Sequence, residues 1–192
     1  MTAIAMLEPP TSAAEHPTLP IGAEAPPFEG LLGTDGERYG FSTFEGREAL
    51  VVIFSSNRCP TAKAYGSRMN ALQADYAAED VQVVAINSNS QHLYPDESFA
   101  AMVDRAAEDG YLFPYLVDEG QRVAKAWGPT CTFHVFLLDR DRRVRYEGRF
   151  DDARLAERVT TNDLRNALDD VLAGREVAAP KTRPFGCGLD LV

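Results

Sequence analysis

Two short and almost wholly apolar segments, residues 49–54 and 81–86, constrain the fold of this chain more than any other feature. Uninterrupted runs of β-branched and aromatic residues are typical of strands that are buried on both faces, as in parallel sheets. Between the two runs, Pro60 stands where helices begin, and apolar residues recur at helical spacing from Ala62 to Tyr76. A strand, a helix and a second strand in this order form a right-handed crossover with parallel strands. The chain is therefore predicted to have an α/β fold.

The rest of the sequence predicts further elements around this unit. Expected in chain order are a hairpin around residues 34–37, a helix over 95–110, a strand over 115–117, a helix over 121–127, a hairpin with strands at 133–138 and 144–146, and a helix over 164–172. A length of 192 residues suits one domain. We expect that domain over residues 23–174, with a disordered leader over 1–22 and an extended C-terminal tail over 175–192.

Composition narrows the classes of function. The chain has 19 Lys and Arg residues against 29 Asp and Glu residues, a formal net charge of -10, so binding to nucleic acid or to an anionic membrane surface is not expected. It has neither an apolar run long enough to span a bilayer nor the basic and apolar pattern of a secretory signal. Its three cysteines are too few, and odd in number, for a disulfide scaffold. A cytoplasmic, reducing location follows, where an exposed thiol is more often chemical than structural.

The sharpest candidate for chemistry is Cys59, which follows the apolar run at 49–54 and directly precedes Pro60. Unpaired backbone N–H groups and the helix dipole favour an anion at a helix start, so the thiolate is expected to be stabilised there. Arg58 and Lys63 are expected to lower the pKa of this thiol further. The alternative is a buried, inert cysteine, which is the commonest fate of a free thiol. The strand-to-helix turn favours the reactive interpretation, which requires an opening from the sulfur to solvent.

Six segments carry a resemblance to a known family. They are residues 51–65 (VVIFSSNRCPTAKAY), 83–89 (VVAINSN), 113–128 (FPYLVDEGQRVAKAWG), 131–139 (CTFHVFLLD), 148–152 (GRFDD) and 185–191 (FGCGLDL). Together they resemble the peroxiredoxin-like branch of the alkyl hydroperoxide reductase/thiol-specific antioxidant family. The resemblance covers residues from about 22 to 190. It implies a thioredoxin-like fold, with a central mixed β-sheet flanked by helices and extended N- and C-terminal tails.

Cys59 carries the chemistry that this resemblance implies. In peroxiredoxins the matching thiol attacks peroxide, and in thioredoxins it is the second cysteine of a Cys-x-x-Cys motif. Ser56 stands where relatives in this branch often have cysteine, so the neighbouring thiol of a local dithiol couple is absent. The Ser56 hydroxyl can instead donate a hydrogen bond to the thiolate, which favours a peroxidase. Val52 stands where peroxiredoxins have proline, and this departure counts against a well-formed peroxide pocket.

A second departure from the family lies at Phe133. By spacing from residues 136–139, this is the position where thioredoxin-fold proteins have a cis-proline and peroxiredoxins have an arginine. Phe133 has no charge, and a cis peptide bond before it would be costly. His134 can replace the lost group as a proton donor or acceptor, or it is a solvent-facing residue of the strand. Arg149 can place its own positively charged guanidinium near the site. Such an arginine more often pairs with carboxylates, such as those at 151–152.

The other two cysteines are candidates for a second thiol. The resemblance places Cys131 in a loop near the start of the helix that carries Cys59, so a Cys59–Cys131 disulfide is sterically feasible. Cys187 lies in the tail, and a mobile tail can deliver a resolving thiol. Each has a simpler alternative, namely loop packing for Cys131 and an incidental thiol for Cys187.

The leading prediction is a thiol-dependent oxidoreductase of the peroxiredoxin-like, antioxidant class that needs no cofactor. Cys59 attacks a peroxide or a disulfide, passes through a sulfenic acid or a mixed disulfide, and is recycled by Cys131, Cys187 or an external thiol such as thioredoxin or glutathione. No metal is expected, because the cysteines and histidines lack the close pairs of a zinc site. The alternative is a thioredoxin-fold binding protein, or a non-redox enzyme, that has lost the dithiol motif. The sequence leaves a homodimer open.

Overall fold

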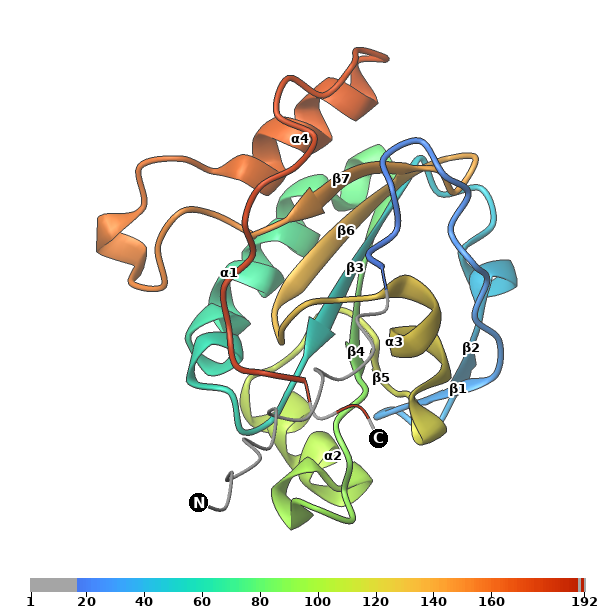
Figure 1. Ribbon diagram of the computed structural model, residues 1–192, viewed down its shortest axis with the longest axis vertical. Coiled ribbons are helices and arrows are strands. Elements are labelled where there is room, and N and C mark those ends of the chain that lie inside the picture. The colour runs from blue at the N-terminus through green and yellow to red at the C-terminus, as the bar shows by residue number, and fades with distance from the viewer. Residues whose placement is uncertain (1–16, 190, 192) are drawn as a thin grey trace, which may run out of the picture.

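A mixed seven-stranded sheet forms the centre of the computed structural model, which describes residues 17–189 and 191 (Figure 1). The strands are β1 (Leu31–Gly33), β2 (Arg38–Tyr39), β3 (Ala49–Ser55), β4 (Val81–Asn87), β5 (Tyr115–Val117), β6 (His134–Asp139) and β7 (Val144–Gly148). They lie in the order β2-β1-β5-β4-β3-β6-β7. Strand β4 is parallel to β3 and to β5, and the other pairs are antiparallel. The predicted crossover and both predicted hairpins are confirmed.

Four α-helices within residues 17–189 accompany the sheet. They are α1 (Pro60–Tyr76), α2 (Phe99–Glu108), α3 (Arg122–Trp127) and α4 (Asp163–Leu172). The single helix predicted over residues 95–110 is wrong in one respect, because the segment divides into a 3-10 turn at Pro95–Glu97 and the helix α2. Ser98 between them has an extended backbone, and its hydroxyl caps α2 by accepting a hydrogen bond from the Ala101 N–H at 3.3 Å.

Strand β3 lies inside the sheet, between β4 and β6, and all seven of its residues are buried. Successive side chains of a strand point to opposite faces, so β3 contributes to two apolar cores. One core, on the side of α1 and α4, includes Val51, Ile53, Met69 and Leu168, and the core on the other face, on the side of α3, includes Leu50, Val52, Phe54 and Trp127 (Figure 1). A strand covered on both faces has no polar side to expose, which explains its uninterrupted apolar sequence.

The described segments before β1 and after α4 are both attached to the sheet. Before β1, the Gly22 N–H donates to the Val144 carbonyl of β7 at 2.7 Å. The first sixteen residues of the predicted leader lie outside the described residues. After α4, the C-terminal segment runs back along β7, where Lys181 forms a parallel β-bridge with Glu147. It then continues to the start of α1 (Figure 1). It thereby reaches the loop that follows β3.

None of the helices described for residues 17–189 is both long and apolar enough to cross a lipid bilayer.

Candidate functional site

Cys59 is the residue that caps the N-terminus of α1, as predicted from Pro60. Its carbonyl accepts the first helical hydrogen bond, from the Lys63 N–H at 3.0 Å. The loop from Ser56 to Cys59 joins β3 to this helix, so the thiol lies where the most buried strand of the sheet ends. Only 1% of Cys59 is exposed, which is less than a turn at a helix start suggests. What covers the thiol therefore decides whether it can react.

The groups around Cys59 are polar and favour its thiolate. Burial raises the pKa of the thiol, but hydrogen bonds from the Thr132 side chain, the Ala62 backbone, and the side chain and backbone of Cys187 outweigh it. The pKa of Cys59 is therefore lowered from its ordinary value. The stabilisation of the anion thus comes from hydrogen-bond donors in the loop before β6, at the helix start and in the C-terminal segment.

Arg58 and Lys63, the cations expected to act on Cys59, are both exposed. The Arg58 guanidinium lies over the Tyr94 ring, 3.7 Å from its centroid. Its charge is among the influences that lower the pKa of Cys187. Arg58 therefore lies close to the thiol pair and acts electrostatically on the outer of its two members.

The C-terminal segment covers Cys59 with a second thiol, that of Cys187. Thr132 holds this residue by its backbone and by its side chain: the Thr132 N–H donates to the Cys187 carbonyl at 2.8 Å, and the Cys187 N–H donates to the Thr132 Oγ1 at 2.9 Å. The single hydroxyl proton of Thr132 is left for either the Cys187 carbonyl, 3.1 Å away, or the Cys59 thiolate. Thr132 thus links the two cysteines.

Cys187 is the protonated partner of this pair. Burial and the hydrogen bond to Cys59 raise its pKa to about 11. Of the two thiols, Cys59 is therefore the one that ionises more readily, and Cys187 is the one that keeps its proton. Unlike Cys59, Cys187 is exposed on the protein surface.

Cys131 lies close enough for the charges of both other cysteines to act on it. It is half-buried, and burial, opposed by a hydrogen bond from the Thr130 side chain, raises its pKa to about 11. It lines a cavity of about 640 Å³ together with Arg149, Arg183 and Phe185. All three predicted cysteines therefore gather at one place as free thiols, and Cys187 is the one hydrogen-bonded to Cys59.

A buried carboxylate that the sequence analysis did not identify organises the loop before Cys59. Glu97, only 3% exposed, accepts hydrogen bonds from the Ser56 hydroxyl at 2.5 Å, the Asn57 N–H at 2.8 Å, the Arg58 N–H at 3.2 Å and the Asn87 side chain at 2.9 Å. The Ser56 hydroxyl therefore gives its proton to Glu97 rather than to the Cys59 thiolate. Its oxygen accepts from the Cys59 N–H at 3.1 Å, which fixes the backbone at the helix start.

Phe133 occupies the predicted position before β6 with a trans peptide bond and a φ of 70°. Positive φ is uncommon for a bulky residue and is maintained only when the surroundings determine it. Here the Phe133 N–H donates to the Phe54 carbonyl, and the ring packs on Tyr65 with centroids 4.3 Å apart. Phe133 thus fixes the backbone from which Thr132 reaches Cys187.

His134 and Arg149 are engaged in structural pairs. His134 is buried, which corrects the interpretation of a solvent-facing histidine: its Nε2 lies 2.6 Å from Glu147, and its Nδ1 accepts from the Thr130 N–H at 3.1 Å. With both ring nitrogens bonded, His134 has no free nitrogen to supply a proton to the thiol site. Arg149 pairs with Asp163 at 2.8 Å rather than with the carboxylates at 151–152.

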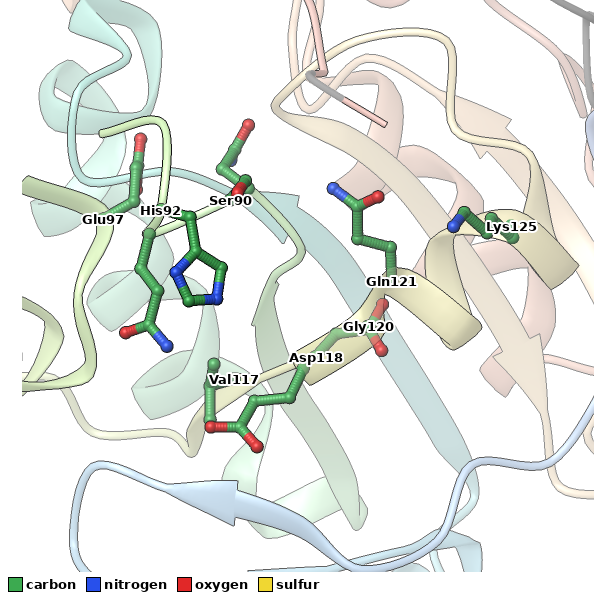
Figure 2. Close-up of a pocket in the computed structure, with 11 residues that line it drawn as sticks. Ser90, His92, Glu97, Val117, Asp118, Gly120, Gln121 and Lys125 are labelled. Carbon is green, nitrogen blue, oxygen red and sulfur yellow. The ribbon is translucent and has the colours of Figure 1, made fainter. Parts of the chain in front are cut away.

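Two neighbouring cavities lie on this side of the molecule, and the smaller one is beside the thiol pair. One, of about 380 Å³, is lined by Ser56, Cys59, Asn89, Glu97, Cys187 and Gly188. The second, of about 540 Å³, shares Asn89 and Glu97 with it and extends between the loop after β4 and helix α3. Figure 2 shows Ser90, His92 and Glu97 on one side of the larger cavity and Gln121 and Lys125 on the other. Cys59 therefore packs against the apolar core on one side and borders the smaller cavity on the other.

Comparison by sequence gives a consistent relationship. The sequence model of the Redoxin family matches residues 20–168. The thiol-disulfide oxidoreductase ResA of Bacillus anthracis is 24% identical over 131 residues, which cover 68% of this chain and 70% of that protein. The matched region contains the sheet, helices α1 to α3 and the loop that carries Cys59.

Comparison by structure gives matches that cover more of the chain. A hypothetical protein, SMc02350, from Sinorhizobium meliloti 1021 superposes with a TM-score of 0.85 at 38% identity, covering 92% of this chain and 97% of that one. An uncharacterized conserved protein from Geobacillus kaustophilus gives a TM-score of 0.83 at 39% identity, covering 88% and 91%. A putative thiol:disulfide interchange protein DsbE from Chlorobium tepidum shares the fold, with a TM-score of 0.66 at 23% identity over 81% and 99%. The predicted thioredoxin-like fold is thereby confirmed.

Proposed function

Since the chain belongs to the redoxin family, we propose that it is a thiol-disulfide oxidoreductase in which Cys59 and Cys187 form the working pair. The observation that carries this proposal is the position of the two cysteines: they line one cavity of about 380 Å³, Thr132 holds Cys187 over Cys59, and the pKa of Cys59 is lowered while that of Cys187 is raised. One sulfur is thus prepared as a nucleophile, and the other is next to it as a thiol. Two neighbouring thiols can give up two electrons and two protons and form one disulfide bond.

Oxidation of the pair proceeds in two displacements at sulfur. When the C-terminal segment moves aside, the Cys59 thiolate attacks one sulfur of a substrate disulfide, forming a mixed disulfide and releasing a first substrate thiolate. That thiolate takes the proton of Cys187. The Cys187 sulfur then attacks the sulfur of Cys59, and the second substrate thiolate leaves. The chain now holds a Cys59–Cys187 disulfide, and the substrate disulfide has become one thiol and one thiolate, which takes its proton from water.

Reduction of the pair uses the exposed member. An external thiolate attacks the Cys187 sulfur, which is exposed, and Cys59 leaves as a thiolate. A thiol with a lowered pKa is the better leaving group, so this direction of attack is both open and favoured. A second external thiol completes the reduction and takes away the external disulfide. We propose a thiol such as thioredoxin or glutathione as this reductant.

Disulfides are a better substrate class for this site than peroxides. The hydrogen bonds that favour the Cys59 thiolate come from a hydroxyl, backbone amides and a thiol. The position where a peroxide pocket has an arginine is Phe133, which offers a ring packed on Tyr65. A cation beside the breaking O–O bond would stabilise a peroxide transition state, and the cation that lines the Cys59 cavity, Arg58, has its guanidinium over the Tyr94 ring.

The experiment is a comparison of substrates and variants. Full-length protein is assayed for reduction of a protein disulfide and for consumption of hydrogen peroxide, with excess thiol reductant in both. We expect faster disulfide reduction, its loss in Cys59→Ser, and a drop of about tenfold or more in Cys187→Ser, because that variant must be resolved by external thiol. Cys131→Ser serves as the matched control and is expected to retain the activity.

Three outcomes would revise the proposal. Peroxide consumption that exceeds disulfide reduction would assign a peroxidase role to Cys59. Loss of activity in Cys131→Ser, with activity kept in Cys187→Ser, would make Cys131 the second thiol. Unchanged turnover in Cys59→Ser would leave a thioredoxin-fold binding protein or a non-redox enzyme as the function.

A further inference from the structure

Thr132 holds Cys187 by the backbone of the cysteine. The Thr132 N–H and hydroxyl both lie within hydrogen-bond distance of the Cys187 carbonyl, and the Cys187 N–H donates to the Thr132 hydroxyl oxygen. Contacts of this kind recognise a polypeptide backbone irrespective of its side chains. The geometry thus defines a seat for an extended segment, occupied here by the chain's own residues 186–188.

The residue before the cysteine has no room for a side chain. A Cβ on Gly186 would lie 1.8 Å from the Thr132 carbonyl oxygen and 2.9 Å from its carbon. Both atoms belong to the backbone, so no side-chain rotation relieves the overlap. Gly188, on the other side of the cysteine, has no atom within 4 Å of the position of a Cβ. The seat therefore selects glycine before the cysteine and not after it.

The seat is rigid, and its occupant closes the site. Thr132 is buried and continues into Phe133, whose left-handed backbone is fixed by the hydrogen bond to Phe54 and by the packing of its ring. Cys59 beneath the segment is 1% exposed. A bulky disulfide can reach Cys59 only when residues 186–188 leave, and their departure frees the N–H and the hydroxyl of Thr132. The place that opens beside the reactive sulfur is thus a backbone-binding place.

We infer that the protein partner of this chain binds through an extended polypeptide segment in which glycine precedes the reacting cysteine, and that this segment replaces residues 186–188 on Thr132. The C-terminal segment is then an internal copy of the partner's sequence, which protects Cys59 until the partner displaces it. This inference rests on the proposed function for the identity of the reacting group. The binding step itself requires no redox reaction.

The first test opens the seat with one methyl group. Full-length Gly186→Ala protein and wild type are treated with iodoacetamide under reducing conditions, and alkylation of Cys59 is followed by mass spectrometry. Displacement of the segment loses two or three hydrogen bonds, so we expect Cys59 to react about tenfold faster or more in Gly186→Ala. Gly188→Ala is the matched control and is expected to react like wild type. Circular dichroism and the unfolding temperature establish that both variants are folded.

The second test refills the seat from outside. A peptide copying residues 182–189, with serine in place of Cys187 so that no disulfide forms, is added to the Gly186→Ala protein. We expect it to slow Cys59 alkylation as its concentration rises, and a peptide with alanine in place of Gly186 to have no such effect. Equal rates for wild type and Gly186→Ala, equal acceleration in Gly188→Ala, or equal protection or none by the two peptides would overturn the inference. Each result is independent of the disulfide reduction assay.

Discussion

Replacing Thr132 by valine removes one hydroxyl and keeps nearly the same shape. The hydroxyl is the largest of the influences that favour the Cys59 thiolate, and it also bonds to both the N–H and the carbonyl of Cys187. Its loss therefore has two separable effects. The Cys59 anion loses a donor while its burial remains, and the C-terminal segment keeps only the backbone hydrogen bond to residue 132.

The expected magnitude follows from the charge on the acceptor. A hydrogen bond to a charged group contributes about 1.5–3 kcal/mol. Since about 1.4 kcal/mol corresponds to a factor of ten in an equilibrium constant, ionisation of Cys59 becomes about tenfold to 100-fold less favourable. The pKa of Cys59 should thus rise, because the burial that the hydrogen bonds had outweighed is no longer compensated.

The assay is the rate of Cys59 alkylation as a function of pH, read by mass spectrometry on the intact chain. The midpoint of this profile reports ionisation, and its plateau reports access to the sulfur. We expect the midpoint of Thr132→Val to lie at higher pH than that of wild type and its plateau to be higher. Thr130→Val is the matched control, because the Thr130 side chain bonds to Cys131, and it should leave the midpoint of Cys59 in place. A midpoint unchanged in Thr132→Val would refute the assignment of this hydroxyl as a donor to the thiolate.

Three further predictions concern the surroundings of the site. Glu97→Ala leaves four donors without their shared acceptor, so the free energy of unfolding in urea should fall by about 3 kcal/mol, and a fall below about 1 kcal/mol would contradict the role of Glu97. Ser56→Cys brings a second thiol close to Cys59, because the Cys59 N–H lies 3.1 Å from the Ser56 hydroxyl oxygen. After mild oxidation, peptide mapping should show a disulfide between positions 56 and 59. Its absence would show that the loop is too rigid to bring the two sulfurs together. For Glu147, burial is outweighed by bonds to His134 and Lys181, and the pKa is lowered from its ordinary value of 4.5. Its stabilisation is present above pH 4.5 and lost as pH falls through the lowered pKa, so the unfolding temperature of wild type should fall more steeply below that pH than that of Glu147→Gln, and parallel curves would argue against it.

The fold could be predicted from local patterns because each of its main elements has its own periodicity. The strand at 49–54 and the stripe of α1 depend on residues that are near in sequence, and both are found where they were expected. The helix predicted over 95–110 failed at its start. There a short turn places the Glu97 carboxylate in the interior. This turn is stabilised by hydrogen bonds from donors about 40 positions away in the chain. No local pattern carries that information.

Some residues of the candidate site could likewise be identified from local sequence, and others could not. Cys59 could be identified because a strand, a proline and a thiol in succession form a local signal. The roles of Thr132 and Glu97 depend on contacts across the sheet, and single threonine and glutamate residues in turns do not stand out. The enclosure of Cys59 by Cys187 depends on where the C-terminal segment crosses the surface, which the sequence of that segment alone does not specify. The burial of His134 likewise follows from its partner on β7, Glu147.

The most direct test of Cys59 and Cys187 as the working pair is to determine which cysteines form a disulfide when the full-length protein is mildly oxidised. The chain is titrated with one equivalent of a small disulfide, remaining thiols are blocked with iodoacetamide, and peptides are mapped by mass spectrometry. We expect a disulfide between Cys59 and Cys187, with Cys131 alkylated. Recovery of Cys59 as an alkylated thiol, or its pairing with Cys131, would contradict it.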